Sequence, residues 1–160
     1  MPQETSASNW TAIALRNAIH SGDVSAVEVC TGYLDRIQDA DVIWNSMTAV
    51  FRDEALSQAT AIDRDRRTTK QPLPLLGVPI TVKDVFDTAG LRSTRGSLLF
   101  SDLAPDADAT AVARLKSAGA ILIGKTNTPE FALRAETSNR LFGCTLHPYD
   151  ACLLYTSPSP

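Results

Sequence analysis

A lysine stands at the end of a short, mostly apolar stretch that runs from Leu75 to Asp84. Apolar and other side chains alternate over residues 78–83, which predicts a strand with Lys83 on the face opposite the apolar set. Two interpretations are open for this side chain. Its stem packs while its ammonium reaches water, or it is held neutral to act as a base. The stretch by itself does not choose between them.

A second polar segment follows another predicted strand. Asp108 to Ala118 is the clearest helix, with Asp108 as its cap and Gly119 at its stop position. The apolar residues 120–123 follow as a strand buried on both faces. Together with strand 78–83 they form a βαβ unit, for which parallel strands are expected.

The polar residues 124–127 are predicted to be the loop that leaves this second strand, and Thr128-Pro129 is predicted to start another helix. Ligands of α/β sheets bind beyond the carboxyl ends of the strands. Lys83-Asp84 and Lys125-Thr126-Asn127 are therefore expected to converge on one rim. Asp84 is not an obvious partner for Lys83, because successive strand residues point apart.

Residues Gly119 to Thr126 match the phosphate-binding pattern G-x-x-x-x-G-K-[ST]. That pattern works only where the four intervening residues form a loop whose N–H groups face a phosphate. Here they are Ala-Ile-Leu-Ile, which predicts strand, and the helix-start signals come later, at Thr128. A nucleotide site, and with it a P-loop NTPase, is therefore rejected.

No metal or cofactor site is indicated. The chain has three cysteines and two histidines, without Cys-x-x-Cys spacing and with the histidines far apart. The aspartates near residue 105 lack the spacing of an EF-hand loop. Cysteine usage of this kind fits a reducing cytoplasm.

Composition excludes several other classes. The chain has 160 residues, 44% of them hydrophobic and 21% charged, which suits one globular domain. A net charge of −3 offers no basic face for nucleic acid. No apolar run approaches the length of a membrane span, and residues 1–9 do not resemble a secretory signal.

The remaining pattern predicts an α/β fold. Helices are expected over 10–20, from Ser25 to about residue 40 and over 53–66, with a short strand over 47–51. Ser25 and Glu28 form a capping-box pattern. Residues 86–100 are expected to be an ordered loop, and loops of this length inside a compact domain are usually functional.

With these segments in place, the chain resembles the amidase signature family, which includes the A subunit of Asp/Glu-tRNA amidotransferases. The similarity runs in order from about residue 10 to residue 150. Its motifs are Leu76–Asp84, Asp87–Thr94, Asp108–Gly119, Gly124–Ala132 and Glu136–Asp150.

The resemblance implies a mixed β-sheet flanked by helices and a Ser–cis-Ser–Lys triad that cleaves an amide carbon–nitrogen bond. Lys83 matches the family's lysine, which implies a largely neutral base that accepts a proton through the bridging cis-serine. A free lysine has a pKa of about 10.4, so work near neutral pH needs a drop of roughly three units. Burial at an apolar strand end is a source of such shifts, which favours a buried Lys83.

The chain departs from the family after residue 150. The family continues into a Gly-Gly-Ser-Ser-Gly-Gly run that holds the bridging serine, and the nucleophile follows later; neither is in this sequence. Residues 1–150 are therefore expected to be the N-terminal part of an amidase domain, and 151–160 a non-native tail from a truncated gene model. Such a fragment is expected to be inactive. It is also expected to fold poorly, because strand 120–123 would lack sheet neighbours.

The complete enzyme is expected to hydrolyse a small-molecule amide in the cytoplasm without a cofactor or metal, and without direct nucleic-acid or membrane contact. The resemblance is compatible with a homodimer of the complete enzyme. One alternative is the glutamine-hydrolysing A subunit of a tRNA-dependent amidotransferase, working with partner subunits. Another is a non-catalytic truncated fragment.

Overall fold

The computed structural model describes residues 10–66 and 73–147, and the proposed tail lies outside these ranges. The chain divides into two compact units. The first unit holds the described residues within 1–36, 51–80 and 114–123, and the second holds those within 37–50, 81–113 and 124–160. The strands β2 (Pro79–Lys83) and β3 (Ile121–Thr126) each pass from the first unit into the second.

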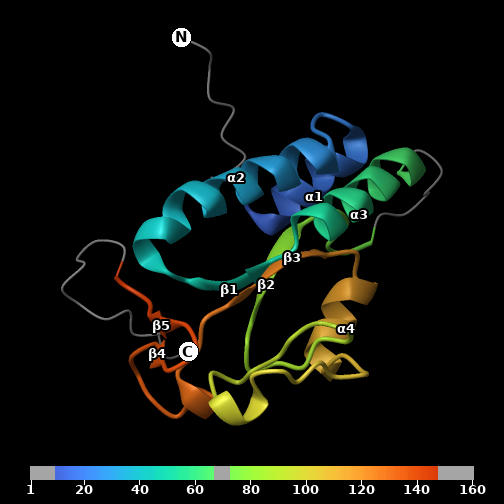
Figure 1. The fold of residues 1–160 in the computed structure, drawn as a ribbon. Coiled ribbons are helices and arrows are strands. Elements are labelled where there is room, and N and C mark those ends of the chain that lie inside the picture. Colours follow the sequence, from blue (N-terminus) through green and yellow to red (C-terminus); the bar gives the residue numbers. More distant parts are fainter. Residues whose placement is uncertain (1–9, 67–72, 148–160) are drawn as a thin grey trace. The chain divides into compact units, whose positions relative to one another are not determined.

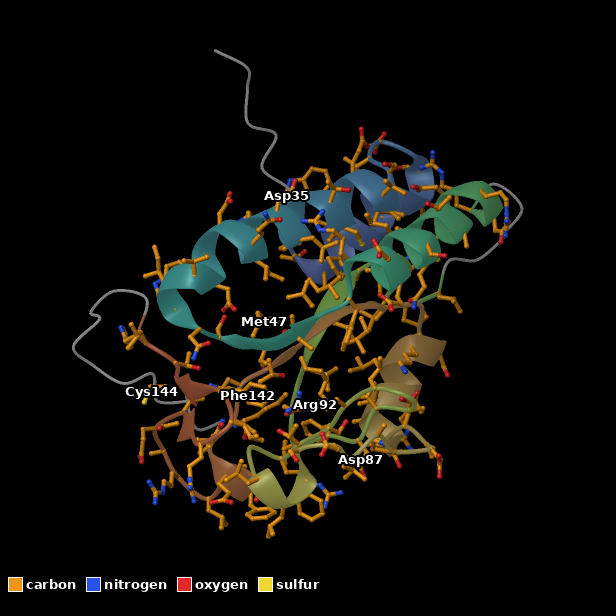
Figure 2. The ribbon with its side chains drawn as sticks, viewed as in Figure 1. Asp35, Met47, Asp87, Arg92, Phe142 and Cys144 are labelled. Atoms are coloured by element: carbon orange, nitrogen blue, oxygen red, sulfur yellow. The ribbon has the colours of Figure 1, made fainter. Side chains whose placement is uncertain are left out.

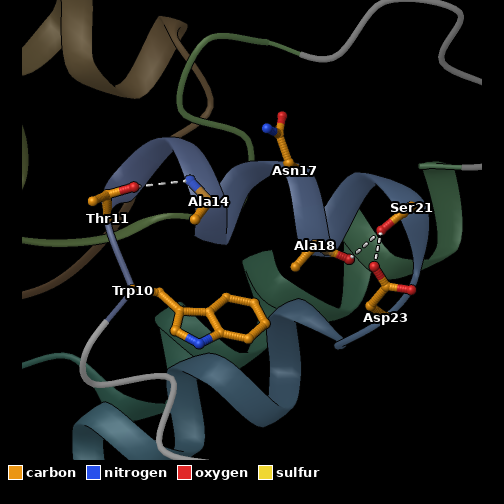
Figure 3. A pocket seen from close by; sticks show the side chains of 7 residues that line it. All are labelled: Trp10, Thr11, Ala14, Asn17, Ala18, Ser21 and Asp23. Carbon is orange, nitrogen blue, oxygen red and sulfur yellow. Dashed lines mark hydrogen bonds between the residues drawn. The ribbon is translucent and has the colours of Figure 1, made fainter.

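The first unit is built on the predicted N-terminal helices (Figure 1). Helix α1 spans Ala12–Ser21, and the Thr11 hydroxyl caps it by accepting from the Ala14 N–H at 3.2 Å (Figure 3). The helix ends at Gly22, whose φ of 90° lies in the left-handed region that glycine adopts without strain.

Helix α2 spans Ala26–Trp44 and begins with the predicted capping box. The Ser25 N–H donates to the Glu28 carboxylate and the Glu28 N–H donates to the Ser25 hydroxyl, both at 2.9 Å. The helix runs past the predicted end near residue 40. It stops where Asn45 takes a φ of 51°, with its N–H still bonded to the Asp41 carbonyl at 2.8 Å.

Helix α3 spans Arg52–Asp65 and ties the first unit together. The Asp63 carboxylate accepts from the N–H groups of Ala26 and Val27 at 2.8 and 3.1 Å, and so satisfies free donors at the start of α2. An Arg66 nitrogen donates to the Ile19 carbonyl at 3.0 Å. The buried side chains of this unit come from all three helices, from the residues just before β2 and from β3, and include Leu15, Ile19, Val29, Cys30, Leu34, Ala55, Ala59, Leu76, Val78, Ile121, Leu122 and Ile123.

The sheet has the order β1-β3-β2, where β1 is Met47–Val50. β1 pairs antiparallel with β3. The Ile121 N–H bonds the Val78 carbonyl at one end, and the Asp84 N–H bonds the Thr126 carbonyl at the other, both at 2.9 Å. Because both partners advance in the same direction, β2 and β3 are parallel as predicted, and the sheet is mixed.

Two sequence-based expectations about β3 are wrong. Residues 124–126 continue the strand rather than leave it as a loop, because Val50 and Ala49 pair with Gly124 and Lys125. The strand also does not lack neighbours, since it lies between β1 and β2 in the described sheet. Poor folding is therefore not expected from a lack of sheet neighbours.

Gly124 allows β1 to approach β3. A Cβ atom on this residue would lie 2.5 Å from the Ala49 carbonyl oxygen, which is backbone and has no alternative position. A side chain at this point is therefore incompatible with the observed pairing.

Helix α4 spans Thr110–Ser117, and Gly119, with φ 91°, stands after it at the predicted stop position. Asp108 lies before its start, where its carboxylate accepts from the Ala89 N–H at 2.8 Å. The loop expected over residues 86–100 contains a 3₁₀ turn, Leu98–Phe100, at its end.

The helix expected from Thr128 does not form. A short 3₁₀ turn, Glu130–Ala132, stands there instead, and Phe131 has a φ of 53°. Backbone bonds explain the break, because the Phe131 N–H donates to the Arg95 carbonyl at 2.8 Å rather than to a helical partner. The short strands β4 (Ser138–Asn139) and β5 (Gly143–Cys144) then pair antiparallel.

Among the residues that the structure describes, no helix is both long and apolar enough to cross a membrane.

Candidate active site

Lys83 is the last residue of β2, where the sequence places it. Its side chain is half-buried. The expectation that Lys83 is buried is therefore wrong for the part of the chain that the structure describes, where this side chain is only half-buried. The reason lies in strand alternation: Val82 and Asp84 on either side are buried, while Lys83 points to the opposite face.

The buried lysine of this region is Lys125, in β3, whose side chain has 0% exposure. Its ammonium nitrogen donates to the Phe86 carbonyl at 2.7 Å, to the Ser93 hydroxyl at 2.9 Å and to the Thr88 hydroxyl at 3.2 Å. An ammonium has three N–H donors, so these partners saturate it. Burying a cation is costly unless it is bonded and paired in this way.

Asp84 supplies the matching negative charge. Its side chain is 1% exposed, and its Oδ1 lies 3.3 Å from the Lys125 nitrogen. That contact is an ion pair, and Oδ1 meets no hydrogen-bond criterion with any described residue. The other oxygen, Oδ2, accepts from the Thr94 hydroxyl at 2.5 Å and from the Thr94 N–H at 3.2 Å.

The environment lowers the pKa of Lys125 from its ordinary value of 10.5. Burial is the main cause, because it disfavours the charged form. The carboxylates of Asp84, Asp87 and Asp108 act in the opposite direction. The cluster thus holds a lysine whose charge is costly but strongly compensated.

Residues 84–95 form a loop whose two ends meet. The Arg95 N–H donates to the Asp84 carbonyl at 2.9 Å, and the Phe86 N–H donates to the Lys83 carbonyl at 3.0 Å. All four partners of the Lys125 ammonium belong to this loop. Its interior is therefore occupied by the amine of a residue from β3.

The same loop is also held by the segment 103–109. The Gly90 N–H donates to the Pro105 carbonyl at 2.8 Å, and the Ser93 N–H donates to the Leu103 carbonyl at 2.9 Å. The Ala109 N–H donates to the Asp87 carbonyl at 2.9 Å. The residues directly after Lys83 are thus fixed from both sides.

Beyond β3, Asn127 begins a second polar network. Its amide donates to the Thr145 hydroxyl at 3.1 Å, and its Oδ1 accepts from the Asn139 amide at 2.7 Å. The Thr145 hydroxyl in turn donates to the Asn45 carbonyl at 2.7 Å. Nearby, the Arg92 guanidinium lies 5.5 Å from the centre of the Phe142 ring; both side chains are labelled in Figure 2. These contacts hold residues 139–145 against the end of β3.

The predicted rim therefore exists, because Asp84 and Thr126 are bonded and Asp84 pairs with Lys125. Residues 121–126 are strand, with the Lys125 amine turned into the loop, so the stretch 119–126 has no loop that could cradle a phosphate. Within the described ranges, no three His, Cys, Asp or Glu side chains gather as a metal site would require.

Two hollows lie apart from these lysines. One of about 570 Å³ is lined by residues of α1 and its flanks, including Trp10, Asn17 and Asp23 (Figure 3). The other, of about 300 Å³, is lined by residues that include Ser97, Glu130 and Arg140. Neither includes Lys83 or Lys125 in its lining.

Sequence reasoning missed Lys125 as the buried ionic centre. The available signal was its position: a lysine separated by one glycine from the apolar residues 120–123, in a segment expected to meet Asp84. Its acceptors in the loop could not be identified, because they lie 32 to 39 residues away in sequence and no local pattern links them.

Comparison with known proteins finds amidase-related sequences and structures that match most of this chain. A family model described as Amidase matches residues 28–155. The A subunit of the glutamyl-tRNA(Gln) amidotransferase from Mycobacteroides abscessus is 40% identical over 139 residues, which are 87% of this chain and 28% of that protein. The chain thus spans less than a third of the length of this relative.

Solved structures agree. A bacterial aryl acylamidase of the amidase signature enzymes family superimposes with a TM-score of 0.82 at 28% identity, over 89% of this chain and 30% of the other. An s-triazine-related vestigial protein complex contains a chain with a TM-score of 0.83 and 36% identity, over 89% of this chain and 31% of that one. The family match covers most of the sequence, including β2, β3 and the loop between Asp84 and Arg95. The chain belongs to the amidase family.

Proposed function

We propose that the complete protein containing these residues hydrolyses the carbon–nitrogen bond of an amide, and that Lys83 is its general base. The single observation that carries this is the place of Lys83 at the end of β2 in a chain of the amidase family. The residue Lys83 is half-buried, whereas the Lys125 side chain is fully buried and its amine binds three protein acceptors. Asp84, the adjacent carboxylate, is bound to Lys125 and Thr94 instead of Lys83.

In the proposed mechanism, Lys83 in its neutral form accepts a proton from a bridging cis-serine. That serine takes the proton of a nucleophilic serine, which attacks the amide carbonyl. The amine leaves with the proton returned through the bridging serine, and water then cleaves the acyl-serine ester to release the acid and restore the serine. Neither the Gly-Gly-Ser-Ser-Gly-Gly run nor the later nucleophile is in the printed sequence. We therefore propose that the 160-residue chain by itself does not turn over amides.

A second candidate is glutamine hydrolysis by the A-type component of a tRNA-dependent amidotransferase, together with partner subunits. It is favoured by a specific observation: a relative with that name, from Rhodopirellula baltica, is 42% identical to this chain over 132 residues. Both candidates cleave the carbon–nitrogen bond of an amide, which in glutamine is that of the side chain. The proposed role of Lys83 is therefore the same in both.

The test measures release of ammonia by the complete protein from glutamine and short primary amides, and release of the arylamine from N-aryl amides. Lys83→Ala is expected to abolish turnover of whichever substrate is used, while Lys116→Ala on α4 is the matched lysine control. Full activity of the Lys83→Ala variant would contradict the proposal. Turnover of glutamine alone, and only with partner subunits, would select the amidotransferase.

The inactivity of the 160-residue chain is tested by the same assay. Amide turnover by the purified chain that disappears in its Lys83→Ala variant would overturn that part of the proposal.

A further inference from the structure

We propose that Lys125 is a positioning residue: by filling the loop 84–95 it fixes the end of β2 and thereby sets the place of Lys83. The inference rests on the proposed role of Lys83 as the base. Its evidence is the set of contacts of the second unit, and it concerns residues for which the proposed mechanism has no use.

The contacts of the Lys125 ammonium all lead from β3 into the loop that follows β2. The Lys125 ammonium leaves β3 and bonds Phe86, Thr88 and Ser93, all of which follow Lys83 within ten residues of chain. These three acceptors have little freedom to move independently. One amine therefore defines the spacing of three points in the loop.

Two of these acceptors, the Thr88 and Ser93 hydroxyls, are themselves oriented by hydrogen bonds within the loop. The Thr88 hydroxyl donates to the Phe86 carbonyl at 3.3 Å, and the Ser93 hydroxyl donates to the Leu91 carbonyl at 3.2 Å. Because their own protons are used within the loop, both hydroxyls present lone pairs to Lys125. The loop thus forms a cage of acceptors shaped for one ammonium.

Two hydrogen bonds through Phe86 link the cage to Lys83. The Lys83 carbonyl accepts from the Phe86 N–H, and the Phe86 carbonyl accepts from Lys125. Asp84, next in the chain, is held by Thr126, Arg95 and Thr94. A change in the cage therefore reaches the backbone of Lys83 through a single turn of chain.

The consequence for catalysis follows from geometry. A misplacement of about 1 Å in a reacting group costs roughly a hundredfold in rate. Loss of the cage is expected to lower kcat, while substrate binding elsewhere is retained and KM changes little. A residue needed only for folding would instead lower the amount of folded protein and leave kcat per folded molecule unchanged.

The experiment uses the complete protein and its amide turnover, with concentrations corrected for the folded fraction. Lys125→Met is expected to reduce kcat by about 10- to 100-fold with KM within about twofold. Lys116→Met is the control and is expected to retain the parent kcat. An unchanged kcat in folded Lys125→Met would overturn the inference.

A milder pair covers the case in which Lys125→Met does not fold. Thr88→Val removes one acceptor without changing the shape of the side chain, whereas Thr88→Ser keeps the hydroxyl and loses only a methyl group. We expect Thr88→Val to lower kcat at constant KM and Thr88→Ser to restore it. Equal kcat values for the two variants would count against the cage.

Lys83→Ala in the same assay separates the two proposals. If it retains activity, the proposed function fails, whatever Lys125 does. If it abolishes activity while Lys125→Met and Thr88→Val retain the parent kcat, Lys83 stands as the base and only the positioning role fails.

Discussion

Lys83 and Lys125 lie on neighbouring parallel strands of one sheet, yet their environments differ completely. The Lys83 side chain is half-buried, whereas that of Lys125 is fully buried, with three hydrogen bonds and an ion pair. Both follow apolar strand residues in the sequence. The difference comes from what surrounds each amine, because a cation can be buried only where acceptors and a counter-charge are assembled around it.

This contrast separates two uses of a lysine at a strand end. An amine that binds three acceptors and a carboxylate holds backbone segments in place and has no free donor. An amine without such a cage keeps the freedom to exchange a proton with a reacting group. In the proposed mechanism, neighbouring positions in the sheet divide the structural and the chemical task between two residues of the same type.

The strongest test of this comparison is the stability of two matched variants. Lys125→Met is expected to lower the free energy of unfolding by about 3–5 kcal/mol, because Asp84 remains buried without its counter-charge. Lys83→Met is expected to change it by less than about 0.5 kcal/mol, as is usual away from the core. Urea denaturation followed by circular dichroism measures both. An equal decrease in the free energy of unfolding for the two variants would contradict the difference between the two lysine environments.

A second test concerns the strand that carries Lys125. Gly124→Ala is expected to cost about 1–3 kcal/mol, since its Cβ would lie 2.5 Å from the Ala49 carbonyl oxygen and push β1 away. Gly32, in α2, has no heavy atom within 4 Å of such a Cβ. Gly32→Ala is therefore expected to stabilise the chain by about 0.5–1 kcal/mol. The sign difference between the two alanines in thermal denaturation is the readout, and a stabilising Gly124→Ala would refute the close approach.

The smallest expected effect is a dependence of the free energy of unfolding on pH. The folded pKa of Lys125 is lowered from 10.5, so between the lowered value and 10.5 the unfolded chain binds more protons than the folded one. Stability contributed by this residue therefore rises with pH across that window and is constant below it. Urea midpoints measured at several pH values up to 10.5 follow the change.

Cys30 acts in the opposite direction and must be removed from that measurement. Burial, with a smaller contribution from Asp63, raises the pKa of its thiol from 9.0 to about 12. Its contribution to stability is therefore complete below pH 9.0 and is lost as the pH rises towards about 12. A Cys30→Ala background leaves the Lys125 effect, and a midpoint that falls with pH in this background would contradict the lowered pKa.

Local signals made much of the fold predictable. The Ser25–Glu28 capping box, the stops at Gly22 and Gly119, and helix α3 all depend on residues within a few positions of each other. The strand that ends at Lys83 and its parallel partner follow from alternation and apolar runs of short range. Even the meeting of Asp84 with residues 125–126 followed from the parallel pairing.

Predictions failed where distant segments compete with local preference. Thr128-Pro129 is a good helix start, but the Phe131 N–H is bonded to the Arg95 carbonyl and only one 3₁₀ turn forms. Residues 124–126 resemble a loop, yet pairing with β1, which lies far earlier in the chain, extends the strand through them.

The sequence by itself determined the family resemblance, the α/β pattern, and Lys83 as the lysine at the end of its strand. Only the tertiary structure decided which lysine is buried. That choice depends on the carbonyl and hydroxyl oxygens of Phe86, Thr88 and Ser93, which surround the Lys125 amine only after the loop has closed over it. Burial of a charge is a property of its completed surroundings, and these are absent from any local stretch of sequence.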